Sequence, residues 1–358
     1  MRRARVAVLR TSPEQVVADY GRLLRLAEYD RTLSRQGELL LKLNLSWTKF
    51  FPACSTPPWQ LDGVVRTLLE DGYQRERLHP IENKTVVTNP RFGAVENRWL
   101  PILERHGLPF IPLPEVEWTV YRFESPLLRL NDIFPEGIEI PKLFIGASVL
   151  HLPTMKVHGH SVTTGAVKNA FGGLLKEVRH YAHEFIHEVL VDLLYMQREL
   201  HPGVFAVMDG TIVGDGAGPR TMVPREGNLI LAGADSVALD ATAARLMGYD
   251  PLGIRYLRLA HERGLGVADP REIELVGDDV SDVNFRCRTS RSLVIWGDQL
   301  IRLGPLRPLK RLLLHSPLVV WAPLASNVYH DLLWYPTVGR ARIRAFAGTG
   351  WGRLFAQY

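Results

Sequence analysis

The chain has 358 residues, 46% of them hydrophobic, and a formal net charge of +5, values that exclude a disordered, collagen-like or coiled-coil chain. Its two cysteines, Cys54 and Cys287, are too few for the about four thiolates of an iron–sulfur cluster, so we expect no cluster. The residues before Pro13 lack the apolar core of a signal peptide, and no stretch reaches the roughly 18 uninterrupted apolar residues of a spanning helix. We therefore predict a cytoplasmic protein without a transmembrane segment.

The first 150 residues alternate between short apolar runs and amphipathic segments. The runs that predict buried strands are 4–10, 38–45, 84–90 and 108–113. A helix capped by Ser12 follows the first run, and another is expected from Pro57–Pro58 to Gly72. Because strands and helices alternate, the sequence predicts an α/β fold with a mostly parallel sheet flanked by helices.

The second half continues this pattern after a looser insert at 114–140. Residues 163–200 are predicted to be helical, and strands at 203–210 and 228–235 are predicted to flank a glycine-rich loop. Two further helices are expected before residue 266. The acidic stretch at 270–290 marks the predicted boundary between an α/β core of residues 1–280 and a C-terminal subdomain of residues 281–358. The core is expected to be either one unit or two subdomains with a break near 114–140.

The basic character of the chain belongs to residues 281–358. They contain eleven Lys and Arg against three Asp and Glu, a net charge of +8, whereas residues 1–280 carry a net charge of −3. They also hold four of the eight tryptophans: Trp296, Trp321, Trp334 and Trp351. We interpret this extension as a packed subdomain, with contact to a membrane surface or an apolar substrate as the alternative. Nucleic acid is not expected as a partner, because no nucleic-acid-binding motif accompanies the charge.

Polar residues that follow predicted strands are the main candidates for a ligand site, because ligands of α/β sheets bind beyond the carboxyl ends of the strands. Lys42 and Asn44 interrupt the apolar run at 38–45, and a buried lysine must be paired or functional. The densest polar cluster follows a later strand and comprises Lys156, His158, His160, Thr164, Lys168 and Asn169. A helix is expected to start at Thr163 or Thr164, and its unbonded N–H groups, together with the lysines, would suit a carboxylate or phosphate.

Two further groups of residues are candidates for chemistry. His180, His183 and His187 fall within a 60° arc of one helix, which suits a divalent metal, a contact surface or a solvated face. Asp209, Asp215, Gly216 and Gly218 belong to a predicted loop whose backbone can approach a ligand closely, although a hairpin turn explains its glycines equally well. Asp235 is predicted to cap its helix, and Asp240 to lie in the first turn of that helix.

The order of these segments resembles the bacterial and archaeal family called domain of unknown function 362, over about residues 38–266. The matching positions are Lys42 and Asn44, Lys156 and His158, Lys168, Asn169 and Gly172, His180, and Asp209, Gly210, Gly216, Gly218 and Pro219. Many members carry ferredoxin-like clusters, but this chain lacks the cysteines. The segment from His160 to Gly173 is also similar, more weakly, to one in nickel-pincer lactate racemases, but here Gly-Ala-Val precedes Lys168 and no Pro-Gly follows.

These observations predict an enzyme of lyase or isomerase type, which acts by Lys/His-assisted proton transfer, elimination or isomerisation. Its expected substrate is a small or medium anionic organic molecule of specialised metabolism that carries a carboxylate or phosphate. His158, Lys168, His180 and Asp209 are the predicted catalytic residues. The residues predicted to bind substrate are Lys42, Asn44, Lys156, His160, Thr164, Asn169, Asp215, Gly216 and Gly218. The cofactor is left open between none and a divalent metal. The alternatives are an isoprenoid-diphosphate enzyme that uses the basic aromatic extension, and a non-catalytic module that binds a metal or a redox partner. The oligomeric state is not predicted.

Overall fold

The computed structural model describes residues 3–85, 87–176, 182–290, 296–297, 300–301, 304 and 321–358. Its main strands are β1 (Ala4–Arg10), β2 (Leu39–Lys42), β3 (Leu78–Glu82), β4 (Ile111–Pro112), β7 (Ser148–His151), β8 (Thr154–His158), β9 (Val162–Thr164), β10 (Val204–Ala217), β11 (Thr221–Gly233) and β12 (Ile273–Gly277). A separate hairpin consists of β5 (Trp118–Tyr121) and β6 (Ile138–Pro141).

The helices cover both faces of the sheet. They are α1 (Val16–Leu26), α2 (Pro58–Glu70), α3 (Pro90–Glu96), α4 (Trp99–His106), α5 (Leu130–Ile133), α6 (Ala166–Leu174), α7 (Ile186–Leu200), α8 (Ser236–Met247), α9 (Arg255–Glu262), α12 (Trp321–Asn327), the π-helix η10 (Val328–Gly339), α13 (Arg340–Ala347) and α14 (Gly350–Phe355).

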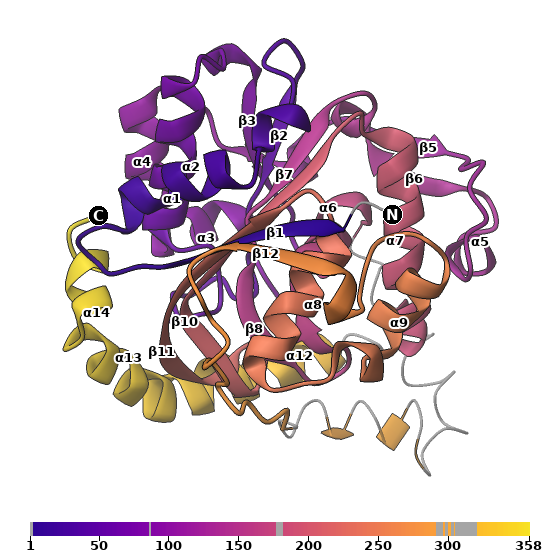
Figure 1. The fold of residues 1–358 in the computed structure, drawn as a ribbon. Helices are drawn as coiled ribbons and strands as arrows, with labels where there is room; N and C mark the ends of the chain where they lie inside the picture. Colours follow the sequence, from indigo (N-terminus) through magenta and orange to yellow (C-terminus); the bar gives the residue numbers. More distant parts are fainter. Residues whose placement is uncertain are drawn as a thin grey trace.

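The ten main strands of the described residues form one mixed sheet. Its order is β12-β1-β11-β10-β7-β2-β3-β4, and β8 pairs with β10 and β9. Parallel pairing joins β1 to β12, β7 to β2 and β10, β8 to β10, and β3 to β2 and β4. The predicted α/β class with a mostly parallel sheet is thus confirmed (Figure 1).

Alternation of side chains along the strands creates an apolar layer on each face of the sheet. In β1, Val6 and Val8 face one layer, which is completed by residues of α6, α7, α8 and α9, whereas Ala7 and Leu9 face the other. This second layer is completed by α1, α2, α4 and the C-terminal helices. Figure 1 shows the two groups of helices on opposite sides of the sheet. A strand that is buried on both faces must be almost entirely apolar, which is why β2 contains three successive leucines.

Several predicted elements differ from the structure. The predicted glycine-rich loop is a long antiparallel hairpin, because Asp209, Gly214 and Gly216 lie within β10 and pair with β11. In the predicted strand at 84–90, Thr85 and Thr88 instead close a turn and Pro90 begins α3, while the strand lies earlier, at β3. The predicted Ser12 side-chain cap is also wrong, since α1 begins at Val16 without one.

The C-terminal helices pack onto the α1–α2 side of the sheet. The Trp351 indole is 1% exposed and lies 5.2 Å from the ring of Trp59, between centroids. Its Nε1 donates to Asn228 Oδ1 at 2.7 Å, which ties α14 to β11. In Figure 1 these helices run in yellow along the lower left edge. In the described part of the chain, no helix combines the length and apolar character needed to cross a membrane.

Candidate functional site

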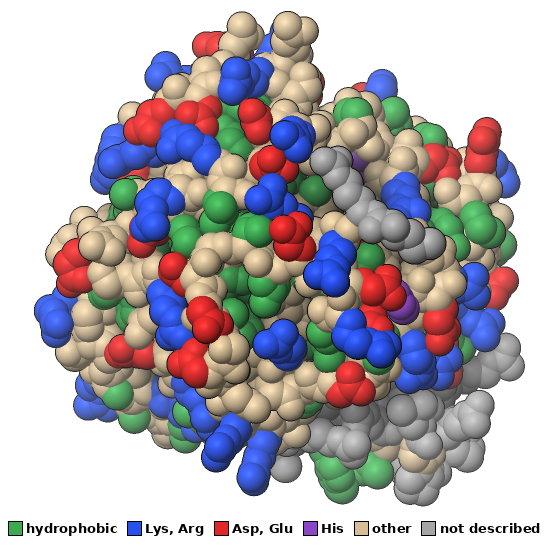
Figure 2. Space-filling view, in the orientation of Figure 1, with side chains coloured by type: hydrophobic (Ala, Val, Ile, Leu, Met, Phe, Trp, Pro, Cys, Tyr) green, Lys and Arg blue, Asp and Glu red, His purple; other side chains and the backbone are tan. Residues whose placement is uncertain are grey.

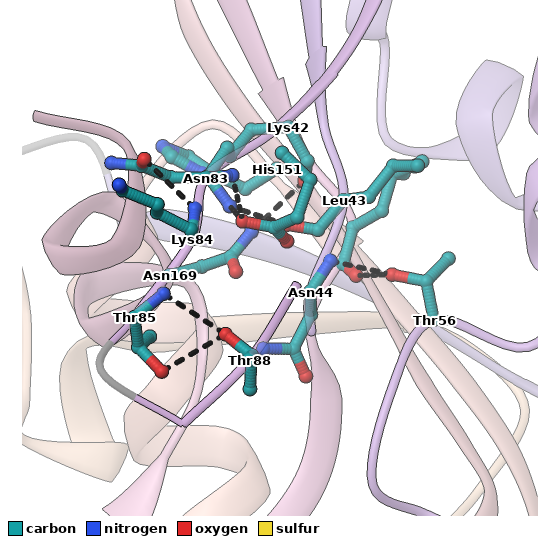
Figure 3. Close-up of polar contacts among 12 residues, drawn as sticks. Lys42, Leu43, Asn44, Thr56, Asn83, Lys84, Thr85, Thr88, His151 and Asn169 are labelled. Atoms are coloured by element: carbon teal, nitrogen blue, oxygen red, sulfur yellow. Dashed lines mark hydrogen bonds and ion pairs between the residues drawn. The ribbon is translucent and has the colours of Figure 1, made fainter. Parts of the chain in front are cut away.

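A cavity of about 220 Å³ lies where β2, β3 and β8 end. Its walls include six predicted site residues: Lys42, Asn44, His158, Lys168, Asn169 and His183. Because β2 and β3 are parallel neighbours, their carboxyl ends meet at one edge of the sheet, which is where ligands of such folds bind. Figure 3 shows Lys42, Asn83 and Asn169 gathered at this edge. The structure therefore brings residues that are more than a hundred positions apart into one site.

Lys42 forms a buried ion pair with Glu82. Nζ of Lys42 lies 2.7 Å from Glu82 Oε1, and the two side chains are 1% and 3% exposed. The ammonium also donates to the Leu43 carbonyl at 2.6 Å, and Glu82 Oε1 accepts from the backbone N–H of Asn83 at 2.7 Å. A buried charge is tolerated only when it is paired and hydrogen-bonded. The pair therefore anchors the two strand ends while it lines the cavity.

Lys156 orients the amide of Asn44. Its Nζ donates to Asn44 Oδ1, Thr154 Oγ1 and the Cys54 carbonyl, at 2.5, 2.6 and 2.8 Å. Burial lowers the pKa of this lysine to about 7, whereas its three acceptors favour the protonated amine. An ammonium has three donors and all of them are used here, so Lys156 has none left for a substrate. With Oδ1 of Asn44 held in this way, the Asn44 Nδ2 donors are the ones available to a ligand.

Asn169 links the cavity to a buried histidine. Its Nδ2 donates to the Lys42 carbonyl at 2.9 Å and lies 3.4 Å from Nδ1 of His151. Nε2 of His151 lies 2.7 Å from Gln197 Oε1 on α7. Burial lowers the pKa of His151 to about 3, so its ring is neutral at neutral pH. This chain of polar contacts crosses from α6 to α7 and fixes the Asn169 side chain at the cavity wall.

His158 carries its proton on Nε2. Its Nδ1 accepts hydrogen bonds from the backbone N–H groups of His160 and Ser161, at 3.1 and 3.3 Å. An imidazole nitrogen that accepts in this way is unprotonated, so the other nitrogen of the neutral ring is the donor. Burial first, and then the positive charge of Lys168, hold the pKa of His158 well below its ordinary value. In this tautomer the Nδ1 lone pair of His158 is occupied by the backbone, and Nε2–H is the polar group that the neutral ring can offer to a ligand.

Lys168 and His183 complete the same wall. Nζ of Lys168 lies 5.6 Å from the centroid of the Phe171 ring, and this ring lies 5.4 Å from that of His183. His160 lies between the two histidines of the cavity, 5.8 Å from the ring of His158 and 5.7 Å from that of His183. The lysine ammonium thus lies over the ring of Phe171, which itself packs against His183.

Arg220 brings a further cation from the β10–β11 turn. Its Nη2 donates to Ser326 Oγ of α12 at 2.9 Å, while its buried Nη1 has no hydrogen-bond partner among the described residues. Burial lowers the pKa of this arginine to about 10, and the guanidinium therefore remains charged at neutral pH. Among the described residues that line the cavity, the charged side chains besides the histidines are thus Lys42, Lys168 and Arg220 and the carboxylate of Glu82.

The N-terminus of α6 is not an anion site. Asp240, from the interior of α8, accepts from the backbone N–H groups of Ala166 and Val167 at 2.7 and 3.2 Å. A side chain at Gly165 would collide with this carboxylate, since a Cβ there would lie 2.0 Å from Asp240 Oδ1. The expectation that N–H groups of this helix bind substrate is therefore wrong, as is the first-turn role predicted for Asp240. The predicted cap by Asp235 is confirmed by bonds from Val237 and Ala238.

The predicted residues of the β10 segment lie away from the cavity. Asp209 is buried and accepts from Tyr20, Trp59 and Thr211, at 2.6, 3.0 and 2.8 Å. These bonds join α1 and α2 to β10, a geometry that favours a structural role over the predicted catalytic one. Asp215 pairs with Arg225 and accepts from the backbone of Arg288.

The predicted binding residues Gly216, Gly218 and Thr164 contact other parts of the protein. The Gly216 carbonyl accepts from the backbone N–H of Ser290 at 2.9 Å, and Gly218 packs so closely that a Cβ would lie 1.9 Å from the Val157 carbonyl. Thr164 pairs with Lys156 in the β8–β9 ladder.

The predicted histidine stripe divides between two environments. His183 lines the cavity, whereas the ring of His187 stacks on Tyr256 with centroids 6.2 Å apart. His180 lies outside the described residues. Within the described residues, no group of three or more His, Cys, Asp or Glu side chains is arranged to hold a metal ion.

Sequence reasoning missed Glu82, Asn83 and Arg220. Glu82 is the last residue of β3 and Asn83 follows it. His79 and Pro80 conceal the pattern of this strand, while the nearby Thr-Val-Val-Thr run suggests a strand where a turn lies. Pro80 is tolerated because β4 pairs only with the last two residues of β3. A lysine buried at the end of β2 was itself the signal that a carboxylate must be near. Nothing in the sequence around Arg220 indicates that a hairpin turn reaches the cavity.

Comparison with known proteins places the chain in a family. One similar protein is the thylakoid-associated protein sll1697 of Synechocystis sp., which is 26% identical over 190 residues, 49% of this chain and 55% of that protein. The chain thus spans about half the length of this curated relative. A crystal structure of a Thermotoga maritima protein aligns with a TM-score of 0.41 and 12% identity, over 70% of this chain and 59% of the other. The pattern of the family described as "Domain of unknown function (DUF362)" matches residues 39–245. More than half of the chain, including most of the cavity wall, lies in this match, and the chain belongs to that family.

Proposed function

We propose that the chain is an enzyme that binds a small anionic organic substrate, through its carboxylate or phosphate, in the cavity at the ends of β2, β3 and β8. The observation that carries this proposal is the convergence of three cationic side chains, those of Lys42, Lys168 and Arg220, on the cavity, where Glu82 is the acidic residue among the described ones. Arg220 adds to this argument, because its buried Nη1 has no hydrogen-bond partner among the described residues and a guanidinium favours an anion there.

The donors of the wall suit the same ligand. Asn44 offers its Nδ2 because Lys156 holds its oxygen, and His158 offers Nε2–H because its Nδ1 accepts backbone bonds. Neutral donors at a cationic site bind the oxygens of a carboxylate or phosphate without adding charge. The volume of about 220 Å³ lies below the roughly 300–1,000 Å³ of sites for drug-sized ligands, which favours a small substrate.

The chemistry proposed is proton transfer, elimination or isomerisation, in which the imidazole of His183, on the same cavity wall, accepts the proton that leaves the substrate. In such reactions negative charge develops on an oxygen of the substrate, and preorganised donors that face this oxygen stabilise the transition state. A neutral His158 can donate Nε2–H to that oxygen, and the cation of Lys168 can stabilise the charge. Lys42, Glu82 and Lys156 are assigned positioning roles, because their polar atoms are engaged with the protein.

Calorimetric titration with phosphate, pyrophosphate and a series of mono- and dicarboxylates tests the proposal. We expect at least one of these anions to bind wild-type protein with 1:1 stoichiometry, and Lys168→Ala and Asn44→Ala to weaken its binding by about tenfold or more, as expected for loss of a hydrogen bond to a charged group. Lys142→Ala is the matched control, since Lys142 is 60% exposed and pairs with Glu117 outside the cavity. Equal affinities in the cavity variants and the control would refute the proposal.

A further inference from the structure

An exposed apolar face extends along α12 and η10. Leu324, Leu332 and Leu333 are 62%, 68% and 58% exposed, and Val328 and Val338 are 39% and 40% exposed. Single exposed apolar side chains are normal on protein surfaces, but five on one continuous helical segment form a patch that calls for a partner. We refer to these five residues as the C-terminal apolar face.

The same segment is fixed to the protein by its opposite face. Ser326 and His330 are 5% and 3% exposed, and the rings of Trp334 and Tyr335 lie 6.0 and 5.0 Å from that of Trp47. Because these inward contacts hold the helix, the C-terminal apolar face is a property of the folded protein rather than of a frayed end.

The charges beside this face are positive. Residues 321–358 contain four arginines and one acidic residue, Asp331, a net charge of +3. Arg340 and Arg344 are exposed on α13, directly after η10. Asp331 accepts from Trp47 Nε1 at 2.7 Å and lies 3.7 Å from Lys49 Nζ, so its charge is largely compensated. By contrast, positive and negative side chains are interspersed over the face of the molecule in Figure 2.

We infer that the C-terminal apolar face docks on an anionic lipid surface. A helix with leucines on one face and arginines beside them suits the membrane interface, where the apolar side chains enter the acyl boundary and the guanidinium groups bind phosphates of the headgroups. A protein partner would satisfy the leucines equally well, but the surplus of arginine selects a surface that is both apolar and negatively charged.

Docking in this orientation places the cavity next to the membrane. Ser326, on the inward side of α12, accepts from the guanidinium of Arg220, which lines the cavity. The inference rests on the exposed residues and charges of the C-terminal helices, and it stands whether or not the cavity has the function proposed above.

Sedimentation with vesicles tests the inference on the full-length protein. The probes are vesicles of neutral phosphatidylcholine and vesicles in which a third of the lipid is phosphatidylglycerol. We expect binding to the anionic vesicles and at least about tenfold weaker binding to the neutral ones, since each of several arginines contributes near an anionic surface. Raising the salt concentration from 0.1 to 0.5 M should weaken binding, because it shortens the range of electrostatic attraction.

Two double variants separate docking from nonspecific adhesion. Leu332→Ser/Leu333→Ser should reduce binding to anionic vesicles by about tenfold or more, because two leucines no longer enter the lipid. Val120→Ser/Ile145→Ser is the matched control, since these side chains are 56% and 47% exposed but lie elsewhere on the protein, and it should bind as wild type does. Absence of vesicle binding, equal loss in both variants, or a self-association that Leu332→Ser/Leu333→Ser abolishes without vesicle binding would overturn the inference.

Discussion

Loss of one partner of the Lys42–Glu82 pair should destabilise the protein far more than loss of both. The two side chains are 1% and 3% exposed, and their charged atoms lie 2.7 Å apart. Lys42→Met leaves the carboxylate of Glu82 buried opposite an apolar side chain, and breaking a buried pair in this way costs roughly 3–5 kcal/mol of unfolding free energy. Lys42→Met/Glu82→Gln removes both charges, and we expect it to recover more than half of that loss.

Urea unfolding at pH 7, followed by fluorescence of the tryptophans, measures these differences. The matched control is the Lys142–Glu117 pair, whose side chains are 60% and 70% exposed. Lys142→Met should change the unfolding free energy by less than about 1 kcal/mol, because exposed ion pairs contribute little. A loss below about 1 kcal/mol for Lys42→Met, or a double variant less stable than the single one, would refute the reasoning.

Four further predictions follow from particular contacts. Gly172→Ala places a methyl group 3.5 Å from Lys42 Nζ, so anion affinity in the titration should fall while the unfolding free energy changes by less than about 1 kcal/mol. His158→Gln, whose amide N–H replaces Nε2–H, should bind the anion with an affinity within about tenfold of wild type. His158→Asn, whose shorter side chain does not reach the position of Nε2, should bind it more weakly than His158→Gln. A nitrogen NMR spectrum of wild-type protein that shows His158 protonated on Nδ1 would contradict the proposed donor role. Burial raises the pKa of Asp240 to about 7, above its value of about 3.9 in the unfolded chain. The folded state therefore binds more protons, and the contribution of this group to stability falls as the pH rises from about 4 to 7. Urea unfolding across this pH range should show a smaller decline in unfolding free energy for Asp240→Asn than for wild type, and an equal decline would contradict the raised pKa. Trp351→Ala should cost about 3–5 kcal/mol in the same assay, because it empties a buried site and leaves Asn228 without its donor.

The fold was largely predictable because its signal is apolar periodicity. The runs at 4–10 and 38–45 contain β1 and β2, and the helix expected from Pro57–Pro58 is α2. Such runs report burial on both faces of a parallel sheet, and this requirement leaves little freedom in the sequence. Where a strand carries polar or proline residues, as in β3, the pattern fails because pairing to a short neighbour tolerates them.

The site was predictable in part because polar side chains stand out against apolar strands. Lys42, Asn44, His158, Lys168 and Asn169 interrupt or follow apolar strands, and the structure brings them to one cavity.

The partner of each of these residues was not predictable, because pairing across strands depends on register and order. Glu82 meets Lys42 only because β3 lies parallel to β2, with Lys42 opposite Ile81. The glycines near Asp209 led to the wrong prediction of a ligand-binding loop. Their small size is needed for close packing within the β10–β11 hairpin, as at Gly214, where a Cβ would lie 2.4 Å from Met222 Sδ, rather than for approach to a ligand.

The central claim is that the cavity at the ends of β2, β3 and β8 holds an anion. A crystal structure of the protein with selenate, located by the anomalous scattering of selenium, tests it most directly. We predict a selenate in the cavity within hydrogen-bonding distance of Lys168 and Asn44, and its absence from crystals of Lys168→Ala grown under the same conditions. Selenate bound only at surface arginines, with none in the cavity of the wild-type protein, would contradict the account.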